Sequence, residues 1–264
     1  MKILLYQVDA FSDHLFSGNP AGVCPLEEWL PEKSMQNIAM ENNLSETAFF
    51  VKTDDQFAIR WFTPLVEVDL CGHATLASAH VIFNHLGWDQ PSISFTSRSG
   101  LLVVTRKEDM ITLNFPSDVI HPAEPPEGLI TSLNVKPLKT YAGKTDLMIV
   151  LATQKEVELL DPDFGLMKKS GGRGIIVTAP GNEVDFVSRF FAPQVGVDED
   201  PVTGSAHTTL TPFWSKQLGK SDLTALQLSK RGGHLWCKYL GDRVEISGKA
   251  ITYLTGEIAI KFFK

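Results

Sequence analysis

The sequence predicts an α+β protein of two similar, pseudo-symmetric lobes, in each of which a sheet wraps around one central helix. Two observations predict this class. The segments Arg60–Asp69 and Arg189–Asp198 share Arg, Phe, Pro, two Val and Asp at the same spacing. A glycine soon follows each segment and opens stretches of equal length, Gly72–Gly87 and Gly204–Gly219. One duplication favours two lobes over a solenoid, which needs at least about three short repeats to bury its core.

Length and composition limit the possible classes of protein. The 264 residues, 43% of them hydrophobic, are enough for one large or two modest cores, and the repeat favours two. The formal net charge is -7 and no stripe of Lys and Arg is present, so we expect no nucleic-acid partner. No apolar run reaches the length of a signal-peptide core or a membrane span, so we expect a cytoplasmic protein without membrane contact.

Strands and helices of the first lobe follow from hydrophobic patterning. Apolar and β-branched runs bounded by turn residues predict strands at 3–11, 47–51, 57–62, 101–105 and 111–115. Pro31 at a first helical position, with Met35 and Ile38 at helical spacing, predicts a surface helix that ends near Asn42. The stretch 74–86 is apolar nearly all round, which predicts a helix enclosed by the sheet.

The most proline-rich stretch, 116–126, is the predicted boundary between the lobes. We therefore place the N-terminal lobe at 1–116 and the C-terminal lobe at 117–251, with the last strand, about 252–264, free to pack back on the N-terminal lobe. Strands of the second lobe are predicted at 148–152, 174–178, 185–191, 226–229, 243–246 and 251–260. Its central helix carries Pro212, which costs about 3 kcal/mol in a regular helix interior, so we expect a kink or a break there.

The N-termini of the two glycine-opened helices are the expected ligand site. If the helices lie side by side in a cleft between the lobes, unpaired N–H groups and positive dipole ends meet at one point. A small carboxylate is the natural guest. His73 lies in the first turn of one helix and its repeat mate Ser205 in the first turn of the other. An isolated histidine there would be a cap or core residue, but the pairing puts a hydrogen-bonding side chain beside the anion site in both halves.

Two carboxylates are candidates for proton transfer. Glu46 precedes the apolar run 48–51, and partial desolvation there would suit it to give and take a proton near neutral pH. A glutamate at the start of a strand is more often simply solvated. Asp200 precedes Pro201, which holds it extended, so its carboxylate can point into the cleft as a base or acceptor. Asp198 matches Asp69 of the first half and is expected to be structural, with three residues inserted after it.

Motifs for other chemistries are missing from the sequence. The two Gly-Lys-Thr/Ser tripeptides, 143–145 and 219–221, lack the upstream glycine of a P-loop. Neither a nucleophile elbow nor a dinucleotide-binding glycine motif occurs. The three cysteines, at 24, 71 and 237, have no C-x-x-C spacing, which supports neither a disulfide framework nor a zinc site. We therefore expect no organic cofactor and no metal.

Five motifs occur together in the chain: Gly18–Val23, Asn43–Phe49, Arg60–Pro64, Cys71–Thr75 and Asp200–His207. They closely resemble motifs of the PhzF-like, phenazine-biosynthesis isomerase family. The resemblance covers essentially the whole chain. It implies the diaminopimelate-epimerase-like fold, with mostly antiparallel or mixed sheets around the two central helices, and a homodimer that acts on a small carboxylate substrate without a cofactor.

Roles of single residues follow from the same resemblance. Glu46 matches the glutamate that moves a hydrogen between ring carbons of a dihydro-hydroxyanthranilate in the best-understood member. His73, Asp200 and Ser205 match positions that orient and polarise the substrate. The expected substrate-binding positions are Gly72 and Gly204, through their backbone N–H groups, with Cys71, Ala74 and Ala206.

Two other functions remain open from the sequence. Racemases of the related folds use two facing cysteines, of which Cys71 resembles the first, while the equivalent turn before Gly204 has none. A racemase or epimerase that pairs Cys71 with Glu46 or Asp200 is therefore an alternative. A binding protein that kept the fold is a third hypothesis, which the intact site residues disfavour.

Overall fold

The computed structural model describes residues 2–260, which fold into two compact units. Unit 1 comprises the described parts of Met1–Asn114 and Ser247–Lys264, and unit 2 comprises Phe115–Ile246. These boundaries lie close to the lobe boundaries expected from the sequence, at 116/117 and 251/252. Both units combine sheet and helix, so the predicted α+β class is confirmed.

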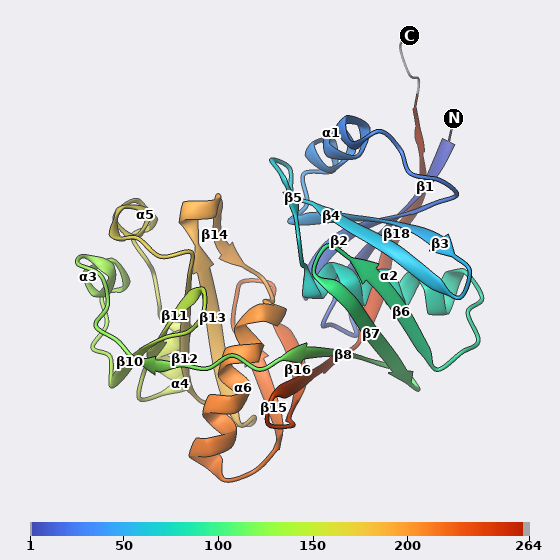
Figure 1. Ribbon diagram of the computed structural model, residues 1–264. Coiled ribbons are helices and arrows are strands. Elements are labelled where there is room, and N and C mark those ends of the chain that lie inside the picture. The colour runs from blue at the N-terminus through green and yellow to red at the C-terminus, as the bar shows by residue number, and fades with distance from the viewer. Residues whose placement is uncertain (1, 261–264) are drawn as a thin grey trace. The chain divides into compact units, whose positions relative to one another are not determined.

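Unit 1 is a mixed sheet with one long helix against it (Figure 1). Its strands are β1 (Lys2–Ala10), β2 (Asn19–Leu26), β3 (Glu46–Thr53), β4 (Gln56–Phe62), β5 (Glu67–Val68), β6 (Ser92–Ser97), β7 (Gly100–Lys107), β8 (Met110–Pro116, which runs into unit 2) and β18 (Ala250–Ala259). Pairs β2–β3 and β4–β6 are parallel, whereas β1–β2, β3–β4, β6–β7 and β7–β8 are antiparallel. The C-terminal strand β18 pairs antiparallel with β1 along its length, from Lys2 opposite Ala259 to Ala10 opposite Ala250.

Helices of unit 1 lie where the periodicity predicts them. The surface helix α1 (Glu32–Asn42) buries Met35 and Ile38 and ends at Asn43, whose left-handed backbone turns the chain toward β3. The central helix α2 (Gly72–His85) packs against β1, β2, β3 and β18, and its buried residues lie on every side. An apolar helix with no polar stripe needs such cover on all sides, so the predicted enclosed helix is confirmed.

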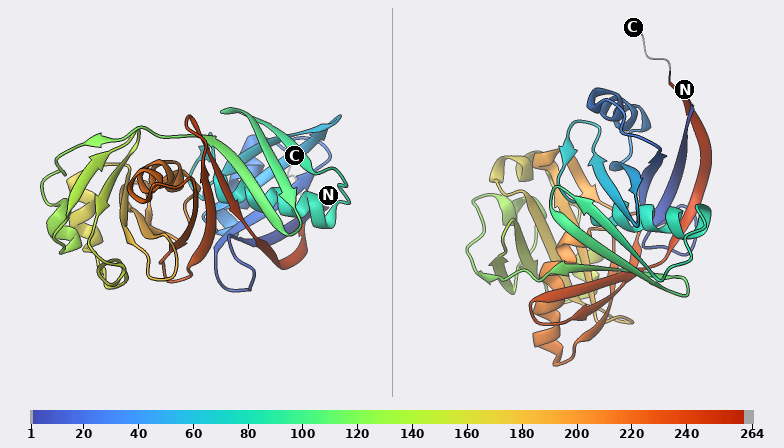
Figure 2. Two further views of the ribbon diagram at one scale, coloured as in Figure 1. Left: turned by 90° about the horizontal axis from the view of Figure 1, so that it is seen from below. Right: turned by 45° about the vertical axis from the view of Figure 1, so that its right-hand side comes forward.

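Unit 2 repeats this arrangement with more short elements. Its strands are β9 (His121–Pro122), β10 (Lys139–Ala142), β11 (Asp146–Val150), β12 (Gly174–Pro180), β13 (Phe186–Ala192), β14 (Val197–Asp200), β15 (Asp222–Gln227), β16 (Gly233–Tyr239) and β17 (Arg243–Gly248, which runs into unit 1). Its helices are α3 (Leu129–Leu133), α4 (Gln154–Glu158), α5 (Phe164–Ser170) and α6 (Gly204–Leu218), with a 3₁₀ turn at Pro193–Val195. The left view of Figure 2 looks along α6 and shows strands of the same unit around it.

Some strands differ from the sequence prediction. Three strands of unit 1 were not predicted: β5 has only two residues, β2 contains two prolines and a glycine, and half of β6 is serine, residues with low strand propensity. In unit 2, β9, β10, β14 and β16 were not predicted, and β15 occupies Asp222–Gln227 rather than 226–229.

Helix α6 is continuous across Pro212, so of the expected kink or break the break is wrong, while the kink stays a prediction. A proline has no N–H to donate to the carbonyl four residues earlier, here that of Thr208. The backbone N–H of Asp118 donates to the Thr208 carbonyl instead, over 3.1 Å. The Asp118 carboxylate in turn accepts a hydrogen bond from the hydroxyl of Thr209, over 2.9 Å. The segment after β8 therefore supplies the hydrogen bond that the proline removes.

Strand pairing shows how the two copies of the duplicated motif correspond. Glu67 of β5 lies opposite Phe62 of β4, and Glu199 of β14 lies opposite Phe191 of β13. Phe62 and Phe191 are matching residues of the repeat, so Glu199 is the structural counterpart of Glu67. The three extra residues of the second copy therefore lie before Glu199, in the segment that holds the 3₁₀ turn.

This register corrects the sequence alignment of two aspartates. Asp198 is not the counterpart of Asp69, as the sequence suggested, since the insertion precedes Glu199 rather than following Asp198. In the corrected register Asp200 matches Val68 of β5. The same register matches Cys71, the residue before α2, with Thr203, the residue before α6.

Candidate functional site

Three of the predicted site residues meet at the start of α2. The Nε2 atom of His73 lies 3.4 Å from a carboxylate oxygen of Glu46, and its Nδ1 atom lies 3.5 Å from the Sγ atom of Cys71. The imidazole therefore lies between a carboxyl group and a thiol, one at each ring nitrogen. The sequence predicted all three residues as site positions, but nothing in their spacing predicted this order.

Local structure explains why Glu46 reaches α2. Helix α1 ends at Asn43 in a left-handed conformation, and three residues later the chain enters β3 at Glu46. Strand β3 pairs in parallel with β2, where Glu46 lies opposite Ala21, and the five residues after Glu46 are buried. The Glu46 side chain is 18% exposed, so it is partly desolvated, as predicted, but still reachable by a small molecule.

His73 is an uncharged, buried group. Its side chain is only 6% exposed, and desolvation lowers the pKa of the imidazole to about 3. A neutral imidazole has one N–H donor and one acceptor nitrogen. Its Nε2 atom is buried without a hydrogen-bond partner, because the approach to Glu46 is longer than a normal N–H···O bond. This nitrogen is therefore available to a closer approach by Glu46 or a ligand.

The same three residues are the group among residues 2–260 that could hold a metal ion. One ligand atom from each of Glu46, Cys71 and His73 lies within 4.8 Å of the others. Carboxylate, thiolate and imidazole are all zinc ligands. However, Cys71 and Glu46 approach different nitrogens of the imidazole, and a single ion binds only one of them. The arrangement fits a hydrogen-bonded line better than a coordination shell.

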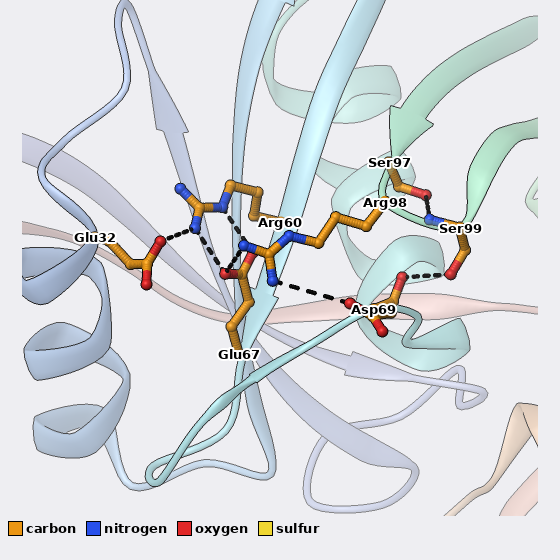
Figure 3. Close-up of polar contacts among 7 residues, drawn as sticks. All are labelled: Glu32, Arg60, Glu67, Asp69, Ser97, Arg98 and Ser99. Atoms are coloured by element: carbon orange, nitrogen blue, oxygen red, sulfur yellow. Dashed lines mark hydrogen bonds and ion pairs between the residues drawn. The ribbon is translucent and has the colours of Figure 1, made fainter.

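The chain leading into α2 is held by a cluster of charged side chains (Figure 3). Glu67 of β5, 8% exposed, accepts two hydrogen bonds of 2.7 Å from Arg60 and lies 2.7 Å from Arg98. The Arg60 hydrogen bonds hold the pKa of Glu67 below its usual value. Ser99 donates to the carbonyl of Asp69 over 2.8 Å. These contacts fix β5 and the residues just before Cys71.

The start of α6 carries a different set of contacts. The hydroxyl of Thr203 donates to the Asp200 carboxylate over 2.5 Å, and the Thr203 N–H donates to Oε1 of Gln227 over 2.9 Å. The Gln227 amide also donates to the carbonyl of Asp200 over 2.8 Å. Asp200 is thus held in place by the loop it belongs to and by β15.

Gln227 was missed by sequence reasoning, although a signal for it exists. In β15 the residues Leu223, Ala225 and Gln227 alternate with exposed or half-buried ones, so the glutamine falls on the buried face. A polar side chain on the buried face of a strand needs hydrogen-bond partners, and for Gln227 they are Thr203 and Asp200. Because the strand was predicted at 226–229 rather than at Asp222–Gln227, this alternation of buried and exposed residues was not recognised.

The remaining predicted positions lie in the first turns of the same helices. Ser205 is exposed, whereas Ala74 and Ala206 are buried, and their part in substrate binding stays a prediction. At the residue before each helix, Cys71 and Thr203, no side chain caps the first turn, whose N–H groups are the expected anion donors at Gly72 and Gly204. That the two helix starts face one cleft stays a prediction.

Comparison with known proteins identifies relatives along nearly the whole chain. The family model described as phenazine biosynthesis-like protein (PhzC-PhzF) matches residues 8–256. A Pseudomonas aeruginosa protein named an uncharacterized isomerase is 49% identical over 98% of this chain and 99% of its own length. A crystal structure of a PhzF family protein from Enterococcus faecalis matches with a TM-score of 0.96 and 48% identity, over 98% of this chain and all of that one.

A more distant structure shows the breadth of the fold. A predicted epimerase from Pseudomonas aeruginosa matches with a TM-score of 0.75 and 17% identity, over 99% of this chain and 100% of that chain. This likeness concerns the fold alone. Separately, no helix within residues 2–260 is long and apolar enough to cross a lipid bilayer.

Proposed function

Since this chain belongs to the phenazine biosynthesis-like (PhzC-PhzF) family, we propose that it is an isomerase that removes a proton from one carbon of a small carboxylate-bearing metabolite and returns it to another. Glu46 is the acid and base of this reaction. The isomerase class follows from the family and from the names of its relatives. The substrate class and the residue roles are our proposal.

The observation that carries the proposal is the pairing of Glu46 with an uncharged, buried histidine. A base that must take up a proton and give it back cannot be locked in a permanent ion pair. Burial lowers the pKa of His73 to about 3, so at neutral pH the imidazole carries no charge. It can give Glu46 one neutral hydrogen bond, which leaves the carboxylate free to become protonated. Partial exposure of Glu46 lets a substrate reach it.

The proposed reaction balances without a co-reactant. The Glu46 carboxylate takes the proton of a C–H bond, whose electron pair becomes delocalised into the unsaturated system of the substrate. The resulting Glu46 carboxyl group, which is partly exposed and exchanges its proton with solvent, then donates a proton to a different carbon, which restores the carboxylate. Positive dipole ends at helix N-termini, with uncapped N–H groups of the first turn, stabilise negative charge on the substrate. Asp200 and Ser205 remain predicted groups that orient the substrate.

A second candidate function is a racemase or epimerase that uses Cys71 as its base. The contact of Cys71 with His73 favours it only by orienting the thiol, since an imidazole with a pKa of about 3 is a poor acceptor of the thiol proton. Against it, the structural counterpart of Cys71 is Thr203, so the second thiol of a two-cysteine racemase is replaced by a hydroxyl group. Only a mechanism that pairs Cys71 with a carboxylate would then work.

Deuterium exchange tests the proposal. A set of small carboxylates, including cyclic dienoic and amino acids, is incubated with the protein in D₂O and followed by mass spectrometry and NMR. We expect an isomerised product that carries solvent deuterium, and Glu46→Gln should abolish the incorporation. Glu41→Gln, at an exposed glutamate of α1, is the matched control and should leave it unchanged. Unchanged incorporation in Glu46→Gln would remove Glu46 from the mechanism, and loss only in Cys71→Ala would favour the racemase.

A further inference from the structure

Each ring nitrogen of His73 faces a partner with different hydrogen-bonding capacity. The Cys71 thiol, 3.5 Å from Nδ1, can donate its proton or accept one. An ionised Glu46 carboxylate, 3.4 Å from Nε2, can only accept. Because His73 is buried and neutral, it has one proton to place on one of its two nitrogens. The position of that proton decides whether the two contacts attract or repel.

We propose that Cys71 is a positioning residue, whose S–H group donates to Nδ1 of His73 and thereby fixes the tautomer in which the Nε2–H group points at the Glu46 carboxylate. In the opposite tautomer, the lone pair of Nε2 would face the oxygen of an ionised carboxylate, and both would be unsatisfied acceptors. In the Nε2–H tautomer each donor faces an acceptor, the thiol at Nδ1 and the Nε2–H group at the carboxylate, so a closer approach of Glu46 completes the line. Among residues 2–260, Cys71 and Glu46 are the groups that approach the two ring nitrogens of His73.

A second buried histidine of the chain has the opposite arrangement. Nδ1 of His207, in α6, lies 2.8 Å from the backbone carbonyl oxygen of Thr203. A carbonyl oxygen only accepts, so His207 must carry its proton on Nδ1. Burial lowers the pKa of His207 to about 4, so this imidazole is also neutral at pH 7. The chain therefore contains two neutral, buried histidines in opposite tautomers, one set by a thiol and one by a carbonyl group.

The consequence for catalysis rests on the proposed function. An N–H group aimed at Glu46 stabilises its carboxylate, which is the form that removes a proton from the substrate. Cys71 needs no contact with the substrate for this role, since it acts through His73. The role also differs from that of a racemase base, because the Cys71 thiol keeps its proton throughout. Its removal should lower kcat more than it changes KM.

The tautomer can be measured without any substrate. The protein, labelled with ¹⁵N in its histidines, is studied at pH 7 by long-range ¹H–¹⁵N correlation spectra, in which the two tautomers give distinct nitrogen shifts. His73 is assigned by the signals lost in His73→Gln, and His207 by those lost in His207→Gln. We expect His73 in the Nε2–H form and His207 in the Nδ1–H form. Cys71→Ser, which keeps a donor, should preserve the His73 pattern, whereas Cys71→Ala should shift it toward the other tautomer.

Unchanged His207 signals in each Cys71 variant control for the fold. An Nδ1–H tautomer of His73 in the unaltered protein, or a His73 pattern in Cys71→Ala identical to that of the unaltered protein, would overturn the proposal. Once a substrate is known, Cys71→Ala should lower kcat roughly tenfold with little change in KM, and Cys71→Ser should recover most of it. Because the NMR result involves no turnover, it stands or falls separately from the role of Glu46 as the acid and base.

Discussion

The first turns of α2 and α6 descend from one duplicated motif, yet they share their supporting contacts and differ in their reactive side chains. In both, an arginine of the long strand binds a glutamate of the short strand that follows, Arg60 with Glu67 and Arg189 with Glu199. The reactive positions differ completely, as Cys71 and His73 of unit 1 correspond to Thr203 and Ser205 of unit 2. The scaffold was kept and the chemistry was changed.

The two helix starts share one further hydrogen bond, which different residue types make. The carbonyl of the residue before each helix accepts a side-chain hydrogen bond from the residue four positions later. In α2 the donor is the hydroxyl of Thr75, bonded to Cys71 over 2.6 Å, and in α6 it is the imidazole of His207, bonded to Thr203 over 2.8 Å. The same geometric need is met by different residue types. One helix start thus carries residues of the proposed proton transfer, while the other is held by hydrogen bonds to Gln227.

The largest expected difference between the two helix starts is in activity. Replacing each carboxylate by its amide, Glu46→Gln in unit 1 and Asp200→Asn in unit 2, removes a proton acceptor with little change in shape. We expect Glu46→Gln to lower kcat by about 10²–10⁴-fold, the usual contribution of a general acid or base. Asp200→Asn should act mainly on substrate orientation, with an effect of about tenfold on kcat/KM. Steady-state kinetics on an identified substrate measures both, and equal losses would show that the two helix starts share the proton chemistry.

The next difference is in stability and concerns the two arginine–glutamate pairs. Glu199 is the one carboxylate paired with Arg189 among residues 2–260, and the side chain of this arginine is largely buried. Arg60 instead keeps Glu32 as a second partner when Glu67 is removed. Glu199→Ala leaves the buried Arg189 charge without a carboxylate, with only the carbonyls of Val157 and Leu160 as acceptors, and should cost about 3 kcal/mol of unfolding free energy, whereas Glu67→Ala should cost about half as much. Urea unfolding curves measure both, and the reverse order would contradict this account.

The contribution of the Arg60–Glu67 pair to the unfolding free energy should be lost at acid pH. Because Arg60 holds the pKa of Glu67 below its usual value, the folded state binds fewer protons than the unfolded chain at acid pH. The contribution of Glu67 to stability is complete above the pKa of the unfolded glutamate and is lost as the pH falls through the folded value. In Glu67→Gln, the unfolding free energy should therefore fall less steeply between about pH 5 and 3 than in the unaltered chain. An equally steep fall would mean that the pair contributes nothing.

The sequence predicted much of the secondary structure but few of the side-chain contacts at the two helix starts. The duplication, the enclosed helix α2 and the surface helix α1 follow from local periodicity, which a sequence displays directly. The contact between Cys71 and His73 depends on side-chain rotamers at a helix start, which no pattern of residue types encodes. The position of the three-residue insertion was wrong because Asp198 and Asp69 happen to match, and only the pairing of β13 with β14 corrects it.

Prediction of a broken α6 failed for a reason that leads to the smallest expected effect. Position 212 of α6 corresponds to His80 in α2, and only α6 has lost a backbone donor there. In Pro212→Ala the restored N–H group would bond the carbonyl of Thr208, which already accepts a hydrogen bond from Asp118. A carbonyl has two lone pairs, but the second bond adds less than the first. We therefore expect the unfolding free energy to rise by about 1 kcal/mol or less, rather than by the roughly 3 kcal/mol that helix propensity alone suggests. A gain near 3 kcal/mol in urea unfolding would show that Asp118 does not compensate for the proline.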